Sequence, residues 1–75
     1  MEHQYLVVVP NYFGRGDSIK TAMKQAQKAG YRGRFPIHQT YIARFPKGSD
    51  PWVNDMGDVQ ANCKQEDAEI LNRPK

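Results

Sequence analysis

The chain has few of the features that disulfide-bonded, zinc-binding, exported or membrane proteins require. Cys63 is the only cysteine among 75 residues, so neither an internal disulfide nor a cysteine-based zinc site can form. The longest apolar run, residues 5–9, is far too short to cross a bilayer, and the first residues lack the basic segment of a signal peptide. We therefore expect a cytoplasmic protein that does not enter a membrane.

Residues that commonly carry catalysis are scarce and scattered. His3 and His38 lie far apart, neither is at metal-ligand spacing from another ligand, and we expect both to be solvated. Cys63 has no neighbouring signature of an activated thiol, and Asp55 and Asp58 are typical of local hydrogen bonding in a turn. A pocket of ~300 Å³ or more would also occupy much of so small a core. The sequence predicts no enzyme, no metal site and no cofactor.

The most conspicuous string is GRGDS at residues 14–18. It contains the Arg-Gly-Asp tripeptide of integrin ligands, but that role requires an exposed loop outside the cell. A glycine-rich turn before a helix can also cradle a phosphate, which would suggest a small nucleotide-handling protein. The Walker and dinucleotide patterns are both absent, and Asp17 would place a negative charge at such a site. We expect only a flexible turn into a helix.

The first half of the chain predicts a strand, a loop and a helix. Residues 5–9 are apolar throughout and rich in β-branched side chains, which favours a strand, and residues 11–16 are expected to form a loop. A helix is predicted over 18–29, with Asp17 or Ser18 as its N-cap and Gly30 after its last turn. Its apolar stripe has helical spacing and consists of Ile19, Ala22, Met23 and Ala26.

The second half predicts two strands and a tail. Residues 40–45 alternate well enough for a strand, and residues 46–51 have the composition of a turn. We favour one long third strand over 52–61 with an interruption near Gly57, and a tight reversal there is the alternative. Residues 62–75 form a polar, acidic tail in which we expect at most a helical turn over 66–71.

These elements predict an α+β fold of β-α-β-β order, with a three-stranded, mostly antiparallel sheet and one helix packed on a face. The single domain spans residues 1–61, and the tail spans 62–75. If the third strand lies between the first two, every pair is antiparallel, whereas direct pairing of the first two strands is parallel through a crossover. We favour the first arrangement because so small a sheet cannot cover a parallel pair on both faces.

The layout over residues 4–61 resembles that of a group of small phage proteins. The resemblance is carried by the first strand, FGRG at 13–16, the alanine-spaced helix, YIAR at 41–44 and WVNDMG at 52–57. This arrangement is similar to short phage and prophage accessory proteins, including phage inhibitors of host RNA polymerase and small anti-CRISPR proteins. The resemblance implies an inhibitor or adaptor that docks on a host complex, and it assigns no role to any particular residue.

Charge is distributed unevenly along the chain. The net charge is +3, yet residues 1–49 carry eight bases against two acids and residues 50–75 carry six acids against three bases. An acidic tail could fold back over a basic body, or the basic body could attract an external polyanion. The candidate binding residues combine a basic helix side with arginines and aromatics in the next loop: Lys20, Lys24, Lys28, Tyr31, Arg32, Arg34 and Phe35.

Two functions fit these candidate residues, and a simple solvated lysine face is the structural alternative. The first is a non-catalytic inhibitor or adaptor that docks on an acidic surface of a larger protein or nucleoprotein complex, because Arg and Tyr often dominate interface energies. The second is direct nucleic-acid binding, in which bases neutralise phosphates and aromatic rings stack on nucleobases.

Overall fold

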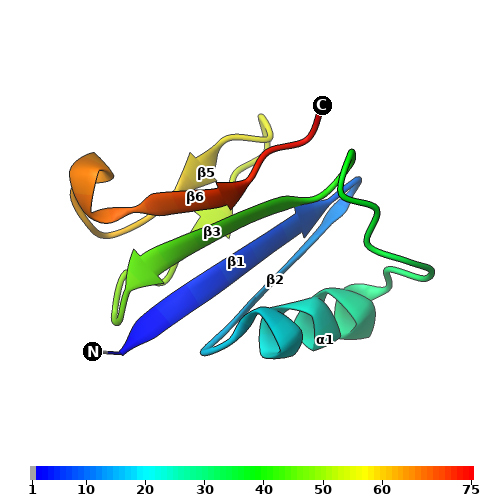
Figure 1. Ribbon diagram of the computed structural model, residues 1–75, viewed down its shortest axis with the longest axis horizontal. Coiled ribbons are helices and arrows are strands. Elements are labelled where there is room, and N and C mark those ends of the chain that lie inside the picture. Colours follow the sequence, from blue (N-terminus) through cyan, green and yellow to red (C-terminus); the bar gives the residue numbers. More distant parts are fainter. Residues whose placement is uncertain (1) are drawn as a thin grey trace.

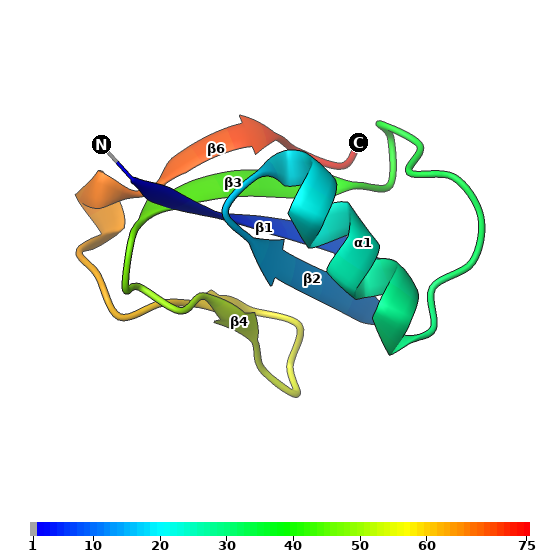
Figure 2. The same cartoon turned by 90° about the horizontal axis from the view of Figure 1, so that it is seen from below.

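The computed structural model describes residues 2–75, and a four-stranded antiparallel sheet of order β2-β1-β3-β6 forms its centre. Helix α1 packs over β2 and β1 on one face, and a two-stranded β4–β5 hairpin lies against the other (Figures 1 and 2). The elements are β1 (His3–Val9), β2 (Tyr12–Gly16), α1 (Ile19–Ala29), β3 (Tyr41–Pro46), β4 (Trp52–Val53), β5 (Val59–Gln60), the 3-10 turn η1 (Gln65–Asp67) and β6 (Glu69–Asn72). The predicted α+β class is confirmed, with four strands in the sheet rather than three.

Strand β2 occupies the segment for which the sequence predicted a loop, so that prediction is wrong. The chain reverses tightly after β1 at Asn11, whose φ of 70° lies in the left-handed region that asparagine tolerates. β2 then returns antiparallel to β1, with Val7 opposite Gly14. Two glycines within five residues obscure the apolar alternation by which a strand is normally recognised.

Gly14 allows α1 to lie unusually close to β2. A β-carbon at this position would lie 1.9 Å from the carbonyl oxygen of Ala22 and 2.4 Å from the amide nitrogen of Ala26. Both alanines are fully buried, so the helix meets the sheet through its smallest side chains. The GRGDS string is therefore part of a strand and the start of a helix. Its two glycines lie against α1, Gly14 close to Ala22 and Ala26 and Gly16 close to Thr21.

The helix predicted over 18–29 is confirmed, with small differences at its start. Ser18 is the N-cap, and its hydroxyl oxygen accepts a hydrogen bond of 3.1 Å from the amide of Thr21. Asp17, the other candidate cap, is exposed and makes no side-chain hydrogen bond to the helix. Gly30 has a φ of 129° and donates its amide to the last turn, as expected for the residue after a helix.

The face opposite α1 carries the larger core side chains. Leu6, Ala43 and Phe45 are buried there, and Val53 and Val59 of the hairpin pack against them. The predicted single strand over 52–61 is wrong, because β4 and β5 are antiparallel partners joined by the tight reversal that was the alternative.

The C-terminal segment also differs from its prediction as a tail outside the domain. Residues 69–72 form β6, which pairs antiparallel with β3 and becomes an edge of the main sheet. The side-chain amide of Asn72 donates to the carbonyl oxygens of Ile37 and Thr40, at 3.0 and 2.6 Å. Residues 62–75 carry three acids and three bases, so the segment is not acidic in net charge, and it is integrated into the fold.

The strand order was also predicted wrongly, and the missed strand β2 explains why. β1 and β3 are direct neighbours and antiparallel, an arrangement that neither sequence-based alternative contained. Because β2 reverses the chain once more before α1, β3 enters the sheet in the opposite direction from β1. One additional strand therefore replaces the parallel crossover by an antiparallel pair.

Candidate functional site

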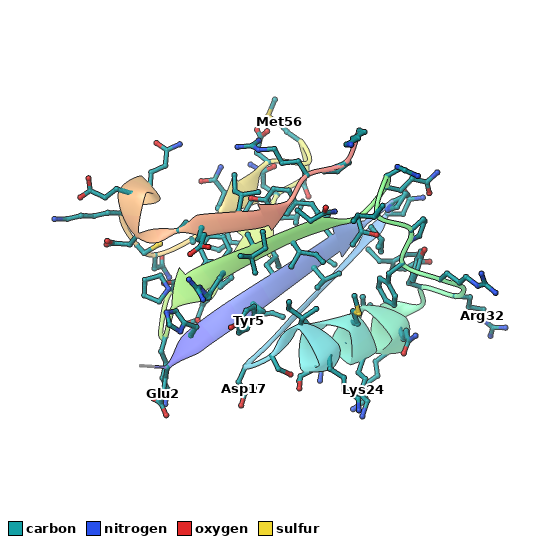
Figure 3. The ribbon with its side chains drawn as sticks, viewed as in Figure 1. Glu2, Tyr5, Asp17, Lys24, Arg32 and Met56 are labelled. Atoms are coloured by element: carbon teal, nitrogen blue, oxygen red, sulfur yellow. The ribbon has the colours of Figure 1, made fainter. Side chains whose placement is uncertain are left out.

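Five basic side chains follow one another along the outer side of α1 and the loop after it. Lys20, Lys24 and Lys28 are four residues apart, so they share one side of the helix at intervals of about 6 Å. That side lies opposite the buried Ala22 and Ala26. Figure 3 shows Lys24 and Arg32 directed away from the sheet. These exposed side chains form a surface that we call the cationic surface: Lys20, Lys24, Lys28, Arg32 and Arg34.

The cationic surface is not neutralised by the protein's own carboxylates. Within residues 2–75, the ion pairs are Arg44 with Glu69, between β3 and β6, and Lys47 with Glu2 at 2.6 Å. Neither pair includes a base of the cationic surface. Its five positive charges are therefore left to water or to a partner, which raises the local concentration of anions.

The C-terminal segment, residues 62–75, does not cover the cationic surface. β6 lies at the edge of the sheet opposite β2, and α1 packs over β2 and β1. The possibility that this segment folds back over the lysines is therefore excluded for the described residues. Figure 1 shows strands β3, β1 and β2 between β6 and α1.

The aromatic residues of the candidate site pack on each other beneath the arginines. The ring centroids of Tyr31 and Phe35 are 5.1 Å apart, and Tyr31 also makes an edge contact with Tyr12 at 6.3 Å. The hydroxyl of Tyr31 donates a hydrogen bond to the carbonyl oxygen of Arg34, which closes the loop on itself. Tyr31 and Phe35 are half-buried, so part of each ring is taken up by packing within the loop.

Sequence reasoning missed Tyr12 as a member of this cluster. Tyr12 is 37% exposed and packs beside Gly30 and Tyr31, next to the C-terminal end of α1. Its contact depends on β2, which the sequence did not reveal, and no spacing along the chain relates residues 12 and 31. The only available signal was its aromatic character beside a predicted turn.

The loop between α1 and β3 is fastened at its far end. The buried hydroxyl of Thr40 donates to the carbonyl oxygen of Pro36 at 2.7 Å, and the amide of Lys75 donates to the carbonyl oxygen of His38 at 2.9 Å. Together with the Asn72 hydrogen bonds, these contacts hold the loop in one shape. A loop that is already ordered loses less entropy when it binds a partner.

The side chains with shifted pKa values, Tyr41 and Arg44, lie on β3 and not on the cationic surface. Burial raises the pKa of the Tyr41 hydroxyl, and the positive charge of Arg73 opposes that rise in part. The pKa of the Arg44 guanidinium is raised by its hydrogen bond with Tyr5 and by the charge and hydrogen bond of Glu69. Both shifts follow from packing and ion pairing within the sheet, and neither creates a group suited to proton transfer near neutral pH.

Several hollows of the described residues lie outside the cationic surface. One of them, of about 450 Å³, is lined by residues around the start of β1 and the end of β2, among them His3, Tyr5 and Asp17. His38 is exposed in a turn, and Cys63 is half-buried beside the core of the hairpin face. Within residues 2–75, no group of three or more His, Cys, Asp or Glu side chains is placed to hold a metal ion.

Comparison of the chain with protein-family models, curated proteins and solved structures finds no match. In the described part of the chain, no helix has both the length and the apolar character needed to span a bilayer. The cationic surface with its braced loop is the strongest candidate site of the described residues.

Proposed function

We propose that this chain is a small non-catalytic binding protein that docks its cationic surface on an acidic surface of a larger protein or nucleoprotein complex. In the phage-type role that its layout suggests, it acts as an inhibitor or adaptor in the cytoplasm of a bacterial host. The observation that carries the proposal is the row of five exposed bases, none of them paired with a carboxylate of the chain itself.

The arrangement supports docking on an acidic protein in two ways. Unpaired charges of one sign steer an oppositely charged partner into contact and accelerate association. Arg32 and Arg34 also extend from a loop whose rings and backbone are already ordered, so their guanidinium groups are presented from a rigid base. Arginine in such a position can form paired hydrogen bonds with a carboxylate, which adds directional specificity.

Direct nucleic-acid binding is the second candidate, because five unpaired bases on one surface also match a phosphate backbone. The aromatic cluster argues against base-specific recognition, since Tyr31 and Phe35 pack on each other. Binding of this kind would rest on phosphates alone and would show little sequence preference.

The main test compares two doubly substituted proteins with the same change in charge. Lys24→Glu with Lys28→Glu reverses two charges on the cationic surface, and Lys64→Glu with Lys75→Glu reverses two exposed charges outside it. We expect the wild type and the second variant to recover a stoichiometric protein partner from nuclease-treated bacterial lysate at moderate salt. We expect the first variant to lose at least about 90% of it, a tenfold change that corresponds to about 1.4 kcal/mol. Equal recovery by both variants would contradict the proposal.

A fluorescence anisotropy titration with duplex DNA separates the second candidate from the first. Phosphate binding predicts an affinity that falls with salt, with a logarithmic slope of about −0.9 for each phosphate neutralised. The Lys24→Glu and Lys28→Glu variant should then lose affinity, while the Lys64→Glu and Lys75→Glu variant should lose less. If duplex at about 1 µM shows no binding at about 50 mM salt, where such contacts are strong, nucleic-acid binding is excluded.

A further inference from the structure

The tip of the β4–β5 hairpin presents one large apolar side chain to solvent. Met56 is 86% exposed, more than any other large apolar residue of the described chain. It stands between Asp55 and Asp58, which are also exposed and belong to none of the ion pairs within residues 2–75. The tip therefore combines an apolar anchor with two free negative charges.

The tip is held in a fixed shape by its first residue. The side-chain oxygen of Asn54 accepts hydrogen bonds from the amides of Met56 and Asp58, at 3.0 and 2.9 Å. The backbone of Asn54 also pairs with Asp58 and Gly57, and Gly57 adopts the positive φ of 83° that the reversal requires. Asn54 makes these contacts with backbone atoms only. The side chains of Met56, Asp55 and Asp58 are therefore not needed to form the turn.

The tip and the cationic surface lie on different sides of the molecule. The hairpin packs on the sheet face opposite α1, and Met56 and Lys24 point in opposite directions in Figure 3. One molecule cannot bring its own tip onto its own cationic surface without unfolding the hairpin. A second copy can meet it without any such change.

We propose that the acidic tip of one copy docks on the cationic surface of a second copy. Asp55 and Asp58 complement the bases around the end of α1, while Met56 contacts the exposed part of Tyr12, because thioethers pack favourably on aromatic rings. The contact joins two different surfaces, so each copy can both offer a tip and accept one. It uses the cationic surface but does not depend on the identity of any host partner.

Such a contact is small, so we expect a dissociation constant on the order of 1 mM and strong sensitivity to salt. In sedimentation velocity with the full chain, the weight-average mass at about 1 mM protein and about 20 mM salt should be about twice 8.6 kDa, because head-to-tail contacts can join more than two copies. It should return to 8.6 kDa at about 300 mM salt, where exposed charges are screened.

Three variants make the test specific. Asp55→Asn, Met56→Ser and Asp58→Asn together remove the tip surface, and Lys24→Gln, Lys28→Gln and Arg32→Gln together remove the receiving surface. Each protein alone should sediment as a single chain, and an equimolar mixture should associate, because one intact contact is restored. The matched control, Glu66→Gln with Asp67→Asn, removes two exposed acids of η1 and should associate like the wild type.

Several results would overturn the proposal. These are a wild-type mass that stays at one chain under the low-salt condition, association of the tip variant equal to that of the wild type, or loss of association in the η1 control. Circular dichroism and thermal unfolding would verify that each variant is folded. Lysate capture is performed near 1 µM, where a contact this weak is dissociated, so either proposal can fail while the other stands.

Discussion

The two faces of the sheet are built in different ways. On the helix face, Gly14 and the fully buried Ala22 and Ala26 bring two backbones into direct contact. On the hairpin face, the large side chains of Leu6 and Phe45 are covered by two strands of only two residues each. The position of α1 on its face is therefore fixed by close backbone contact. The position of the hairpin on the other face depends on the burial of side chains, which can shift when one of them is changed.

This contrast also explains where binding surfaces can arise. The outer side of α1 carries three lysines because the helix is already held on its inner side by its smallest residues. Charges there can be exchanged without touching the core. On the hairpin face, Ile70 lines a hollow with Phe45 and Val59 and is 40% exposed, because the cover is short.

Replacing Gly14 by alanine should have the largest effect on stability. The new β-carbon would collide with the backbone of α1, and no rotamer change can relieve that contact. We expect the free energy of unfolding to fall by about 3 kcal/mol or more, measured by chemical denaturation. Gly16→Ala is the matched comparison, because there the nearest atoms belong to the side chain of Thr21 and a smaller loss is expected. Equal losses would mean that the helix face is not fixed by its backbone.

Phe45→Ala probes the hairpin face, and we expect an intermediate effect. Phe45 is 4% exposed, and its removal leaves a cavity that the short hairpin can partly fill by moving inward. The expected loss is about 3 kcal/mol or slightly less, below that of Gly14→Ala. Amide hydrogen exchange should show faster opening in β4 and β5 while α1 remains protected. Uniform loss of protection would show that the two faces do not differ in this way.

Tyr41 offers the smallest and most specific test of burial on β3. Burial raises its pKa above the ordinary value of 10.0, so the folded state retains the phenolic proton at a pH where the unfolded chain has lost it. The contribution of the protonated Tyr41 hydroxyl to the free energy of unfolding is therefore fully present below pH 10. It is lost as the pH rises through the folded-state pKa. Stability should fall less for Tyr41→Phe than for the wild type between about pH 9 and about pH 11. If the stability of both proteins fell equally over this pH range, burial of the Tyr41 hydroxyl would not be the cause of the decline.

Local patterns were sufficient for the elements whose signals lie within a few residues. The first strand, the helix over 18–29, its glycine after the last turn and the strand near 40–45 were all predicted, because apolar spacing and caps report directly on backbone conformation. The exposure of the lysines followed from the same helical period. Arg32 and Arg34 were predicted as candidate binding residues from the composition of the loop. In the structure they are exposed and lie in the loop that follows α1.

The wrong predictions concern β2, β6 and the β4–β5 hairpin. They share one cause, because whether these segments form strands depends on the strands with which they pair. β2 contains two glycines and lies against α1, while β6 is a strand of only four residues that pairs with the edge of β3. Residues 54–58 close a hairpin through the hydrogen bonds of Asn54, which composition did not distinguish from a bulge. Tyr12 joined the candidate site only through β2.

The sequence by itself determined that this is a small α+β domain with a basic helix side and few groups capable of catalysis, because composition and periodicity are local properties. Tertiary structure decided the number and direction of the strands, the place of the C-terminal segment and the bracing of the loop by Tyr12, Tyr31 and Phe35. These features depend on hydrogen bonds and steric contacts between residues distant in the chain. No short-range pattern records such contacts.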